Sequence, residues 1–396
     1  MKILLVCQHY YPEPFRVTEV AEGLVRRGHD VSVVTGIPNY PEGVFYSGYS
    51  KKERCEETIN GVHVHRVPIV PRGKSAFQRL RNYLSFAKSA KKYVKTLPSG
   101  FDIVLVYQLS PVMMAEPGLL YGKLHHVPVI IYELDPWPSN LSAGGFKASS
   151  PIYRYFARIS RKIYSTASHV FVSSKRHISY LNSLCGRSLP ISYLPQFASE
   201  NGEYKGGDGS EFHFLYAGNV GQALPIEVML SSFSKACKAK QNLYLDIAGS
   251  GSALEEAKQY CKTHEISNVV FHGWLKKEKF ETLSNKADAA IVLLNHQLYS
   301  QSTVPGKVST YLKLGFPVLV ADDGATKELI EEAKAGIAVP TSDEESLTKA
   351  FLEMAGLGKE KLLSYSKNGK AYYQENMAET RFFDSLEEKM RILKNN

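Results

Sequence analysis

The sequence lacks the features that mark disulfide-rich secreted proteins and membrane-spanning proteins. Only five of its 396 residues are cysteine, and no two of them form a C-x-x-C pair. An odd number of widely spaced cysteines argues against a disulfide framework or a structural zinc, and it favours a reducing compartment. No apolar run approaches the ~18 residues that a transmembrane helix needs, and the run from Ile3 to Cys7 is too short for a signal peptide. We therefore expect a cytoplasmic protein.

Several catalytic motifs are also missing. No G-x-S-x-G segment is present, which disfavours a hydrolase of that class. The segment "GSGSAL" has Leu254 where a dinucleotide-binding fingerprint needs its third glycine. Lys307 follows a glycine, but Val308 stands where a phosphate-binding P-loop needs serine or threonine. His63 and His65 fall on one face of a short strand without a third ligand nearby, so a metal site is not favoured.

Positive charge is concentrated in the first half of the chain. Residues 1–200 contain 25 Lys and Arg against 13 Asp and Glu, whereas the remainder contains 23 against 26. Much of the excess lies in residues 71–97, at Arg72, Lys74, Arg79, Arg81, Lys88, Lys91, Lys92 and Lys95. In the same segment the apolar residues Tyr83, Phe86, Ala90, Tyr93 and Leu97 recur at helical spacing. The pattern predicts a basic amphipathic helix that either lies on an anionic membrane surface or packs on its own domain. Nucleic acid is not an expected partner.

The order of apolar and helical segments predicts an α/β protein with two similar halves. Residues 3–7, 17–27 and 31–35 form a strand, helix and strand, and further apolar runs alternate with helical patterns. A polar, glycine-rich segment at 199–211 interrupts the pattern, after which it starts again. We expect two Rossmann-like domains facing across an interdomain cleft, at 1–198 and 199–370. A helical tail at 371–396 could pack on either one.

Loops that contain glycine follow three expected strands of the second half. The first has Gly218, Asn219 and Gly221, the second has Gly249 and Gly251, and the third has Gly273 followed by Trp274. Glycines here either only turn the chain or let backbone amides approach a ligand closely. Further along, Pro305 and Gly306 place Lys307 at a helix start, where free N–H groups and a lysine suit a diphosphate. Together these features predict a phosphorylated ligand at the carboxyl ends of the strands.

Six segments carry a resemblance to a known family. They are "HYYPEPFRVTEVAEGLVRRGHDVSVVTGIPNYPEG", "NYLSF", "LDPWPSNL", "YAGNVG", "FHGWL" and "VPGKVSTYLKLGFPVL". In these segments the chain resembles the family 4 glycosyltransferases of GT-B architecture, particularly those that build bacterial surface polysaccharides. The resemblance implies a nucleotide-sugar donor, usually UDP-linked, held by the second domain, and a lipid-linked or glycan acceptor held by the first. It also implies transfer with retention of configuration and no required metal or other cofactor.

The same resemblance assigns roles to individual residues. Those expected to bind the nucleotide sugar are Gly218, Asn219, Gly221, Gly249, Gly251, Gly273, Trp274, Leu275, Pro305, Gly306 and Thr310. Those expected to face the acceptor are Glu13, Arg16, Asn39 and Trp137. Asp135, in the D-x-W-P element near the reacting sugar, and Lys307 are expected to be catalytic. Lys307 would stabilise the leaving nucleotide, because negative charge builds on its diphosphate as the sugar bond breaks.

Some positions depart from the family pattern. Ser139, Gln222, Ser250, Thr310 and Ala325 are neutral where many relatives carry charged residues. Two hypotheses therefore follow. The first is an active glycosyltransferase that meets a lipid-linked acceptor at the inner face of the membrane, with the basic first domain as its docking surface. The alternative is a catalytically impaired relative that binds a partner transferase or a glycan.

Overall fold

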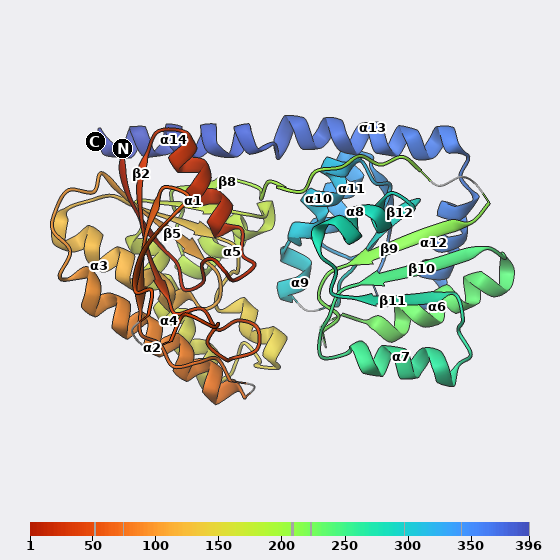
Figure 1. The fold of residues 1–396 in the computed structure, drawn as a ribbon, viewed down its shortest axis with the longest axis horizontal. Helices are drawn as coiled ribbons and strands as arrows, with labels where there is room; N and C mark the ends of the chain where they lie inside the picture. The colour runs from red at the N-terminus through yellow and green to blue at the C-terminus, as the bar shows by residue number, and fades with distance from the viewer. Residues whose placement is uncertain are drawn as a thin grey trace. The chain divides into compact units, whose positions relative to one another are not determined.

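The computed structural model describes residues 1–50, 53–73, 75–206, 210–221, 224–296, 298–341 and 343–395. The chain separates into two compact units, one formed by Met1–Leu194 with Phe383–Asn396 and the other by Pro195–Phe382. Each unit has a largely parallel sheet with helices packed against it (Figure 1). The α/β fold class with two Rossmann-like domains is therefore confirmed.

The first unit has an eight-stranded sheet in the order β3-β4-β2-β1-β5-β6-β7-β8. Its strands are β1 (Lys2–Val6), β2 (Asp30–Gly36), β3 (Glu56–Ile59), β4 (Val62–Val67), β5 (Ile103–Gln108), β6 (Val129–Glu133), β7 (His169–Val172) and β8 (Ile191–Tyr193). All neighbours are parallel except β3 and β4. Ile3 of β1 pairs with Val31 on one side and with Ile103 on the other. Central strands are buried on both faces, which explains their continuous apolar runs.

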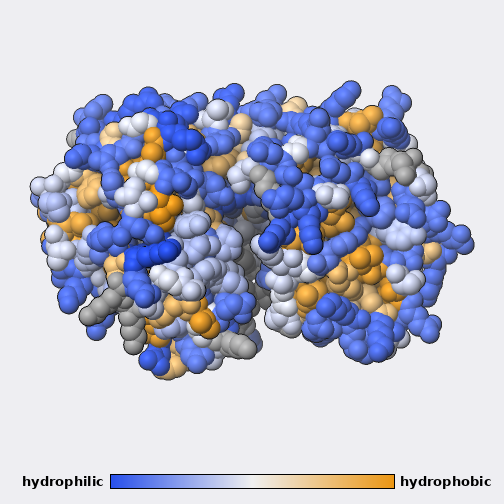
Figure 2. Space-filling model, viewed as in Figure 1, coloured by the Kyte–Doolittle hydropathy of each residue, from blue (hydrophilic) through white to orange (hydrophobic). Residues whose placement is uncertain are grey.

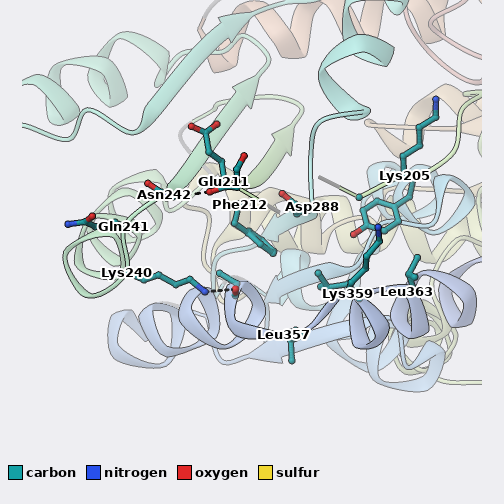
Figure 3. A pocket seen from close by; sticks show the side chains of 15 residues that line it. Lys205, Glu211, Phe212, Lys240, Gln241, Asn242, Asp288, Leu357, Lys359 and Leu363 are labelled. Carbon is teal, nitrogen blue, oxygen red and sulfur yellow. Dashed lines mark hydrogen bonds between the residues drawn. The ribbon is translucent and has the colours of Figure 1, made fainter. Parts of the chain in front are cut away.

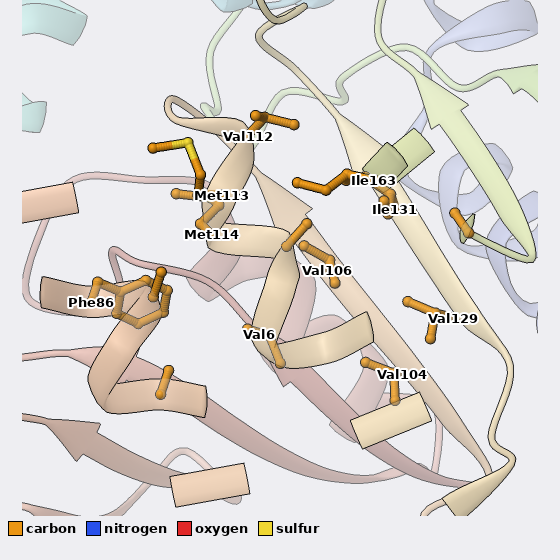
Figure 4. Close-up of a cluster of buried hydrophobic side chains, with 14 of the residues drawn as sticks. Val6, Phe86, Val104, Val106, Val112, Met113, Met114, Val129, Ile131 and Ile163 are labelled. Atoms are coloured by element: carbon orange, nitrogen blue, oxygen red, sulfur yellow. The ribbon is translucent and has the colours of Figure 1, made fainter. Parts of the chain in front are cut away.

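Helices pack on this sheet and close its core. They are α1 (Val17–Arg26), α2 (Ala76–Val94), α3 (Glu116–His125), α4 (Pro151–Thr166), α5 (Lys175–Cys185) and α14 (Glu379–Lys394), with 3₁₀ turns at Val112–Ala115 and Ser139–Gly144. Figure 4 shows Phe86 of α2 near valines of the sheet and methionines of the first 3₁₀ turn. Ser75 begins α2 with a capping box to Gln78.

The helical stripe that the sequence indicates in α2 faces inward. Phe86 and Ala90 are fully buried, and Tyr93 and Leu97 pack against the same core cluster. For these residues the structure supports packing on their own unit rather than contact with a membrane. Lys74, a member of the basic segment, lies outside the described residues.

From Phe383 onward, α14 belongs to the first unit. The Phe383 ring packs directly over Gly23 of α1, where an added Cβ would lie 2.1 Å from the ring. Glu387 accepts hydrogen bonds from Arg27 at 2.9 and 3.1 Å, and its carboxylate lies 2.9 Å from His29 Nε2. The bond to Arg27 lowers the pKa of Glu387 to about 2. The tail thus adds a helix and ion pairs to the amino-terminal sheet (Figure 1).

The second unit has a six-stranded, all-parallel sheet in the order β11-β10-β9-β12-β13-β14. Its strands are β9 (Phe212–Ala217), β10 (Leu243–Ala248), β11 (Val269–Gly273), β12 (Ala289–Leu293), β13 (Val318–Ala321) and β14 (Gly336–Val339). Its helices are α6 (Ile226–Ala239), α7 (Leu254–Thr263), α8 (Lys277–Ser284), α9 (Leu298–Ser302), α10 (Gly306–Leu314), α11 (Ala325–Ala333), α12 (Glu344–Gly356) and α13 (Lys359–Asn376). Phe214, Phe233 and Phe351 meet edge to face in its core.

Each sheet has a point where the strand order reverses. In the first unit β1 lies between β2 and β5, and in the second unit β9 lies between β10 and β12. Loops after such neighbouring strands diverge and leave room for a ligand at the carboxyl edge. Predicted site residues follow β1 at the first of these edges, and β9 and β10 at the second.

Figure 2 shows a largely hydrophilic face with apolar side chains gathered in a few patches. None of the helices within the described ranges is long and apolar enough to cross a bilayer.

Candidate active site

Lys307 lies at the amino end of α10, against the end of β9. Its Nζ is 3.9 Å from the centroid of the Tyr216 ring, and a Cβ added to Gly218 would lie 2.7 Å from the same nitrogen. The side chain is half-buried, and desolvation lowers the pKa of its ammonium to about 7. Pro305 is the N-cap residue and no side chain caps the helix. The Val308 N–H donates to the Pro305 carbonyl at 2.9 Å, so the N–H groups of Gly306 and Lys307 are the ones available to an anion.

Three glycine loops are joined through their backbones beside this lysine. Gly218 N donates to the Ala248 carbonyl at 2.9 Å, and Gly249 N donates to the Gly273 carbonyl at 2.8 Å. A Cβ on Gly249 would lie only 1.8 Å from the Gly218 carbonyl oxygen, and the φ angle of Gly249 is +158°. A side chain would therefore force the loops after β9 and β10 apart. The structure thus brings the predicted glycines together with Lys307.

Asn219 fills the space between the next two predicted glycines. Cβ atoms built on Gly221 and Gly251 would lie 2.8 Å from Asn219 Nδ2 and 2.6 Å from Asn219 Oδ1, respectively. The Tyr216 hydroxyl donates to the Asn219 carbonyl at 2.8 Å, which ties this loop to the ring that Lys307 covers. The geometry forms a compact cradle of backbone and one amide side chain.

Gly273, Trp274 and Leu275 follow β11 at the edge of the same sheet. Gly273 has φ +65°, in the left-handed region that favours glycine. Trp274 is 72% exposed, whereas Leu275 packs against the core cluster that includes α10 residues. Their backbone is tied to the cradle through the bond from Gly249 to Gly273.

The side chain of Thr310, one turn into α10, is hydrogen-bonded to a residue of the same unit. Its hydroxyl donates to Glu200 Oε2 at 2.9 Å. The preceding residue, Ser309, donates to the Gln196 carbonyl at 2.7 Å, and a Cβ on Gly306 would lie 3.6 Å from the Gln196 side chain. The segment Gln196–Glu200 therefore runs along this helix and supplies a carboxylate next to the neutral residue 310.

The other neutral positions are dispersed. Ser139 is buried and donates to the Pro136 carbonyl at 2.7 Å, Ser250 is exposed, and Ala325 is the buried first residue of α11. Gln222 lies outside the described residues.

In the first unit, Asp135 is held by Ser110. Asp135 Oδ2 accepts hydrogen bonds of 2.9 Å from both the backbone N–H and the hydroxyl of Ser110. The same hydroxyl accepts from Trp137 Nε1 at 3.0 Å and from Asn140 Nδ2. Trp137 is buried and packs edge to face on Phe156. The sequence analysis did not identify Ser110. This residue lies in the loop after β5, at the same edge of the sheet as the loops that hold the predicted residues.

Glu13 and Asn39 are buried and engaged with their own loops. Glu13 Oε1 accepts from the backbone N–H groups of Asn39 and Tyr40, at 2.8 and 2.7 Å, while Oε2 lies 2.9 Å from His9 Nδ1. Asn39 Oδ1 accepts from the Arg72 N–H at 2.7 Å. These two predicted acceptor residues hold the loops after β1 and β2 together.

Arg16 precedes α1 as its N-cap residue. Burial raises the pKa of Tyr107, and the Arg16 guanidinium opposes part of that rise. Arg16 therefore lies within electrostatic range of the end of β5, which leads to Ser110 and its partner Asp135.

A buried histidine–glutamate pair lies at the carboxyl edge of the first sheet and was not predicted from the sequence. His177 Nδ1 of α5 lies 2.8 Å from Glu133 Oε2 at the end of β6, and both side chains are fully buried. Burial raises the pKa of Glu133. No periodicity or motif in the sequence indicates this contact, because the two residues are far apart along the chain.

A cavity of about 310 Å³ in the second unit lies away from these loops. Figure 3 shows Phe212, Asn242 and Asp288 at its wall, and these residues begin or directly precede β9, β10 and β12. The cavity is thus at the amino edge of the sheet, and its lining includes none of the predicted site residues.

Within the described part of the chain, no group of three or more His, Cys, Asp or Glu could hold a metal ion. His63 lies 3.3 Å from the Thr58 hydroxyl, and His65 pairs with Glu56 and stacks on Tyr93.

Comparison with known proteins agrees with this organisation. Residues 15–195 match the model of the glycosyl transferase 4-like domain, and residues 203–372 match that of the glycosyl transferases group 1. The chain is 22% identical over 351 residues to WcaI of Escherichia coli strain K12, named for glycosyl transfer in colanic acid biosynthesis; the alignment covers 83% of this chain and 84% of WcaI.

Solved structures share the fold. The sucrose-phosphate synthase of Thermosynechococcus elongatus has a TM-score of 0.77 at 14% identity, covering 99% of this chain and 98% of that one. HepE of Anabaena, in complex with UDP and glucose, has a TM-score of 0.71 at 13% identity, covering 99% of each chain. WaaG, a glycosyltransferase of lipopolysaccharide biosynthesis, has a TM-score of 0.70 at 12% identity, covering 100% of each. With both halves matched by glycosyl transferase models, the chain belongs to the family 4 glycosyltransferases of GT-B fold.

Proposed function

We propose that this glycosyltransferase moves a hexosyl or N-acetylhexosaminyl group from a UDP-linked donor to a lipid-linked or polysaccharide acceptor, with retention of configuration, in cell-surface polysaccharide biosynthesis. The UDP complex of HepE supports the nucleotide, and the names of WaaG and WcaI support the pathway class. In this scheme the second unit binds the donor, Arg16 of the first unit faces the acceptor, and Asp135 is a catalytic residue near the reacting sugar.

The observation that carries the proposal is the position of Lys307. An ammonium at an uncapped helix start, in contact range of the Gly218 loop, suits a diphosphate. Its pKa near 7 means that an arriving dianion would draw a proton onto it, which strengthens the ion pair. As the sugar leaves, the same charge would stabilise the nucleotide diphosphate.

Binding of a panel of nucleotides and nucleotide sugars, measured by calorimetry, tests donor and site together. UDP-linked sugars should bind, and Lys307→Ala should weaken binding by about 10- to 100-fold, as expected for a charged hydrogen bond. Lys262→Ala, an exposed lysine on α7, is the matched control and should bind as the parent does. Release of UDP from the bound donor with a lipid-linked acceptor then reports transfer.

The impaired-relative hypothesis makes the opposite prediction. A chain that binds no nucleotide, and whose cellular role survives Lys307→Ala, would be a partner- or glycan-binding protein. The Glu200 carboxylate beside Thr310 supports the active enzyme, because negative charge is present at this turn of α10 although residue 310 is neutral.

A further inference from the structure

Strand β11 carries one extra residue beside β10. Up to Phe271 the register is regular, and Phe271 pairs with Ile247. The next pair joins Gly273 to Ala248, so His272 is skipped in the register. This irregularity is a β-bulge, in which two residues of one strand stand opposite one residue of its neighbour, and bulges re-aim the chain beside functional sites. Here the bulge directly precedes the loop that begins at Gly273, which is one of the loops assigned to the donor.

Asp246 of β10 holds the bulged residue from the neighbouring strand. Its Oδ1 lies 2.6 Å from His272 Nε2, and its Oδ2 lies 2.8 Å from His213 Nδ1 of β9. The direct neighbours of Asp246 in the sheet are the apolar residues Leu215 and Val270, so both histidines reach it along diagonals. An ionised carboxylate only accepts hydrogen bonds, so each facing ring nitrogen carries a proton. One carboxylate thus joins β9, β10 and β11.

The carboxylate of Asp246 is kept ionised and oriented. Burial would raise its pKa, but the hydrogen bonds from His213 and His272 outweigh burial and lower that pKa. His213 is fixed in turn, because its Nε2 lies 3.3 Å from Glu211 Oε2 and its ring stacks on Tyr244 with centroids 5.0 Å apart. Asp246 therefore offers Oδ1 to His272 in one orientation, through a charge-assisted bond of the stronger kind.

The loop after the bulge takes its position from the chain that enters it. The Trp274 side chain is 72% exposed and so adds little anchoring. The Gly273 carbonyl accepts the Gly249 N–H at 2.8 Å, which links the loop to the glycine cradle. A shift of the bulge would move this carbonyl and the backbone that follows it. The bond from His272 to Asp246 fixes the chain immediately before Gly273.

We propose that Asp246 and His272 are positioning residues for the nucleoside of the donor. They hold the β11 bulge so that the backbone of Gly273–Leu275 faces the nucleoside, while Lys307 holds the diphosphate. Strand β11 lies two strands from β9, about 10 Å at the usual spacing of strands, which leaves room for a nucleoside between the two groups. This inference rests on the proposed donor site and adds to it a physical basis for preferring one base.

Binding of UDP and ADP to the full chain, measured by calorimetry, tests this role. His272→Ala should lower the UDP affinity by about five- to tenfold, the worth of about one hydrogen bond, and should leave the ADP affinity nearly unchanged. His272→Gln should restore UDP binding, because the glutamine amide can donate to Asp246 as Nε2 does. Lys307→Ala should instead weaken both nucleotides by the same factor. His264→Ala, at the exposed C-cap residue of α7, is the matched control and should bind as the parent does.

Hydrogen exchange of the nucleotide-free protein gives a second readout. The Gly249 N–H, which bonds to Gly273, should exchange faster in His272→Ala, whereas the Gly218 N–H, which bonds to Ala248, should not change. Thermal melts check that each variant folds.

The results that would overturn the positioning role are clear. They are a parent without preference for UDP, equal loss of UDP and ADP in His272→Ala, glutamine that fails to restore UDP binding, and unchanged exchange at Gly249. A parent that binds no nucleotide would refute the proposed function and this inference with it. UDP binding that persists in His272→Ala would refute this inference alone.

Discussion

Lys307→Met should make the protein harder to unfold at pH 7 while weakening its hold on UDP. Burial lowers the pKa of Lys307 from its usual value of 10.5 to about 7. With about 1.4 kcal/mol for each pKa unit, that shift costs about 4 kcal/mol of folding free energy at pH 7. Attraction to the Tyr216 ring offsets about 1–2 kcal/mol of this cost. Methionine, which needs no hydration, should therefore raise the free energy of unfolding by about 2–3 kcal/mol.

The sign of the pH dependence provides an internal check. Between about pH 7 and 10.5 the unfolded chain binds more protons than the folded chain, because its lysine keeps the ordinary pKa. The parent should gain stability as the pH rises through this window, and the advantage of methionine should shrink. Urea unfolding at both ends of the window measures the difference.

Calorimetry with UDP completes the test. The variant should lose about 10- to 100-fold in affinity, and the proton uptake that accompanies binding to the parent above pH 7 should disappear. A variant that is less stable than the parent would refute the desolvation argument. Unchanged UDP affinity would refute the placement of the diphosphate at Lys307.

Three further predictions concern backbone, ion pairs and pH. Gly249→Ala should abolish UDP binding and lower the free energy of unfolding by about 1–3 kcal/mol, because the added Cβ would lie 1.8 Å from a carbonyl oxygen. Calorimetry measures UDP binding and thermal melting measures stability. Normal UDP binding by this variant would contradict the proposed role of the glycine loops. Glu387→Gln should lower the free energy of unfolding by about 1–3 kcal/mol at neutral pH. This loss should vanish as the pH falls toward 2, because the bond to Arg27 lowers the pKa of Glu387 to about 2. Urea unfolding at several pH values measures the loss, and a loss that does not change with pH would contradict the prediction. Asp246→Asn should lower the free energy of unfolding by about 1–2 kcal/mol at roughly pH 5.5 and by less at roughly pH 9. Asp246 raises the pKa of His213, so the stability that this pair contributes is complete below the unfolded pKa of histidine and is lost as the pH rises. Equal losses of stability at both pH values would contradict the prediction.

Much of the fold was accessible from the sequence because its strands are buried on both faces. The strand Ile103–Gln108, for example, is an unbroken apolar run from Ile103 to Tyr107, and such a run can be recognised in the sequence. The cradle at Lys307 was accessible for a related reason. Its glycines lie directly after strands, and parallel strands bring their carboxyl ends to one edge.

The contacts of the first unit were less accessible because they join distant residues. Ser110 meets Asp135 only after β5 and β6 pair, and Glu13 reaches Asn39 only after β1 and β2 pair. A sequence motif marked Asp135 and Glu13 as candidates but carried no information about these partners. The packing of α14 on the first unit likewise joins residues near opposite ends of the chain, such as Arg27 and Glu387.

The return of α14 to the first unit imposes an order on biosynthesis. A ribosome finishes Leu194 and must then make the whole of Pro195–Phe382 before Phe383 can cover Gly23. At roughly 5–20 residues per second that interval lasts on the order of 10–40 s. During it, the amino-terminal unit is a nascent domain without its closing helix, open to chaperones and proteases. The unit that is begun first is thus the one completed last.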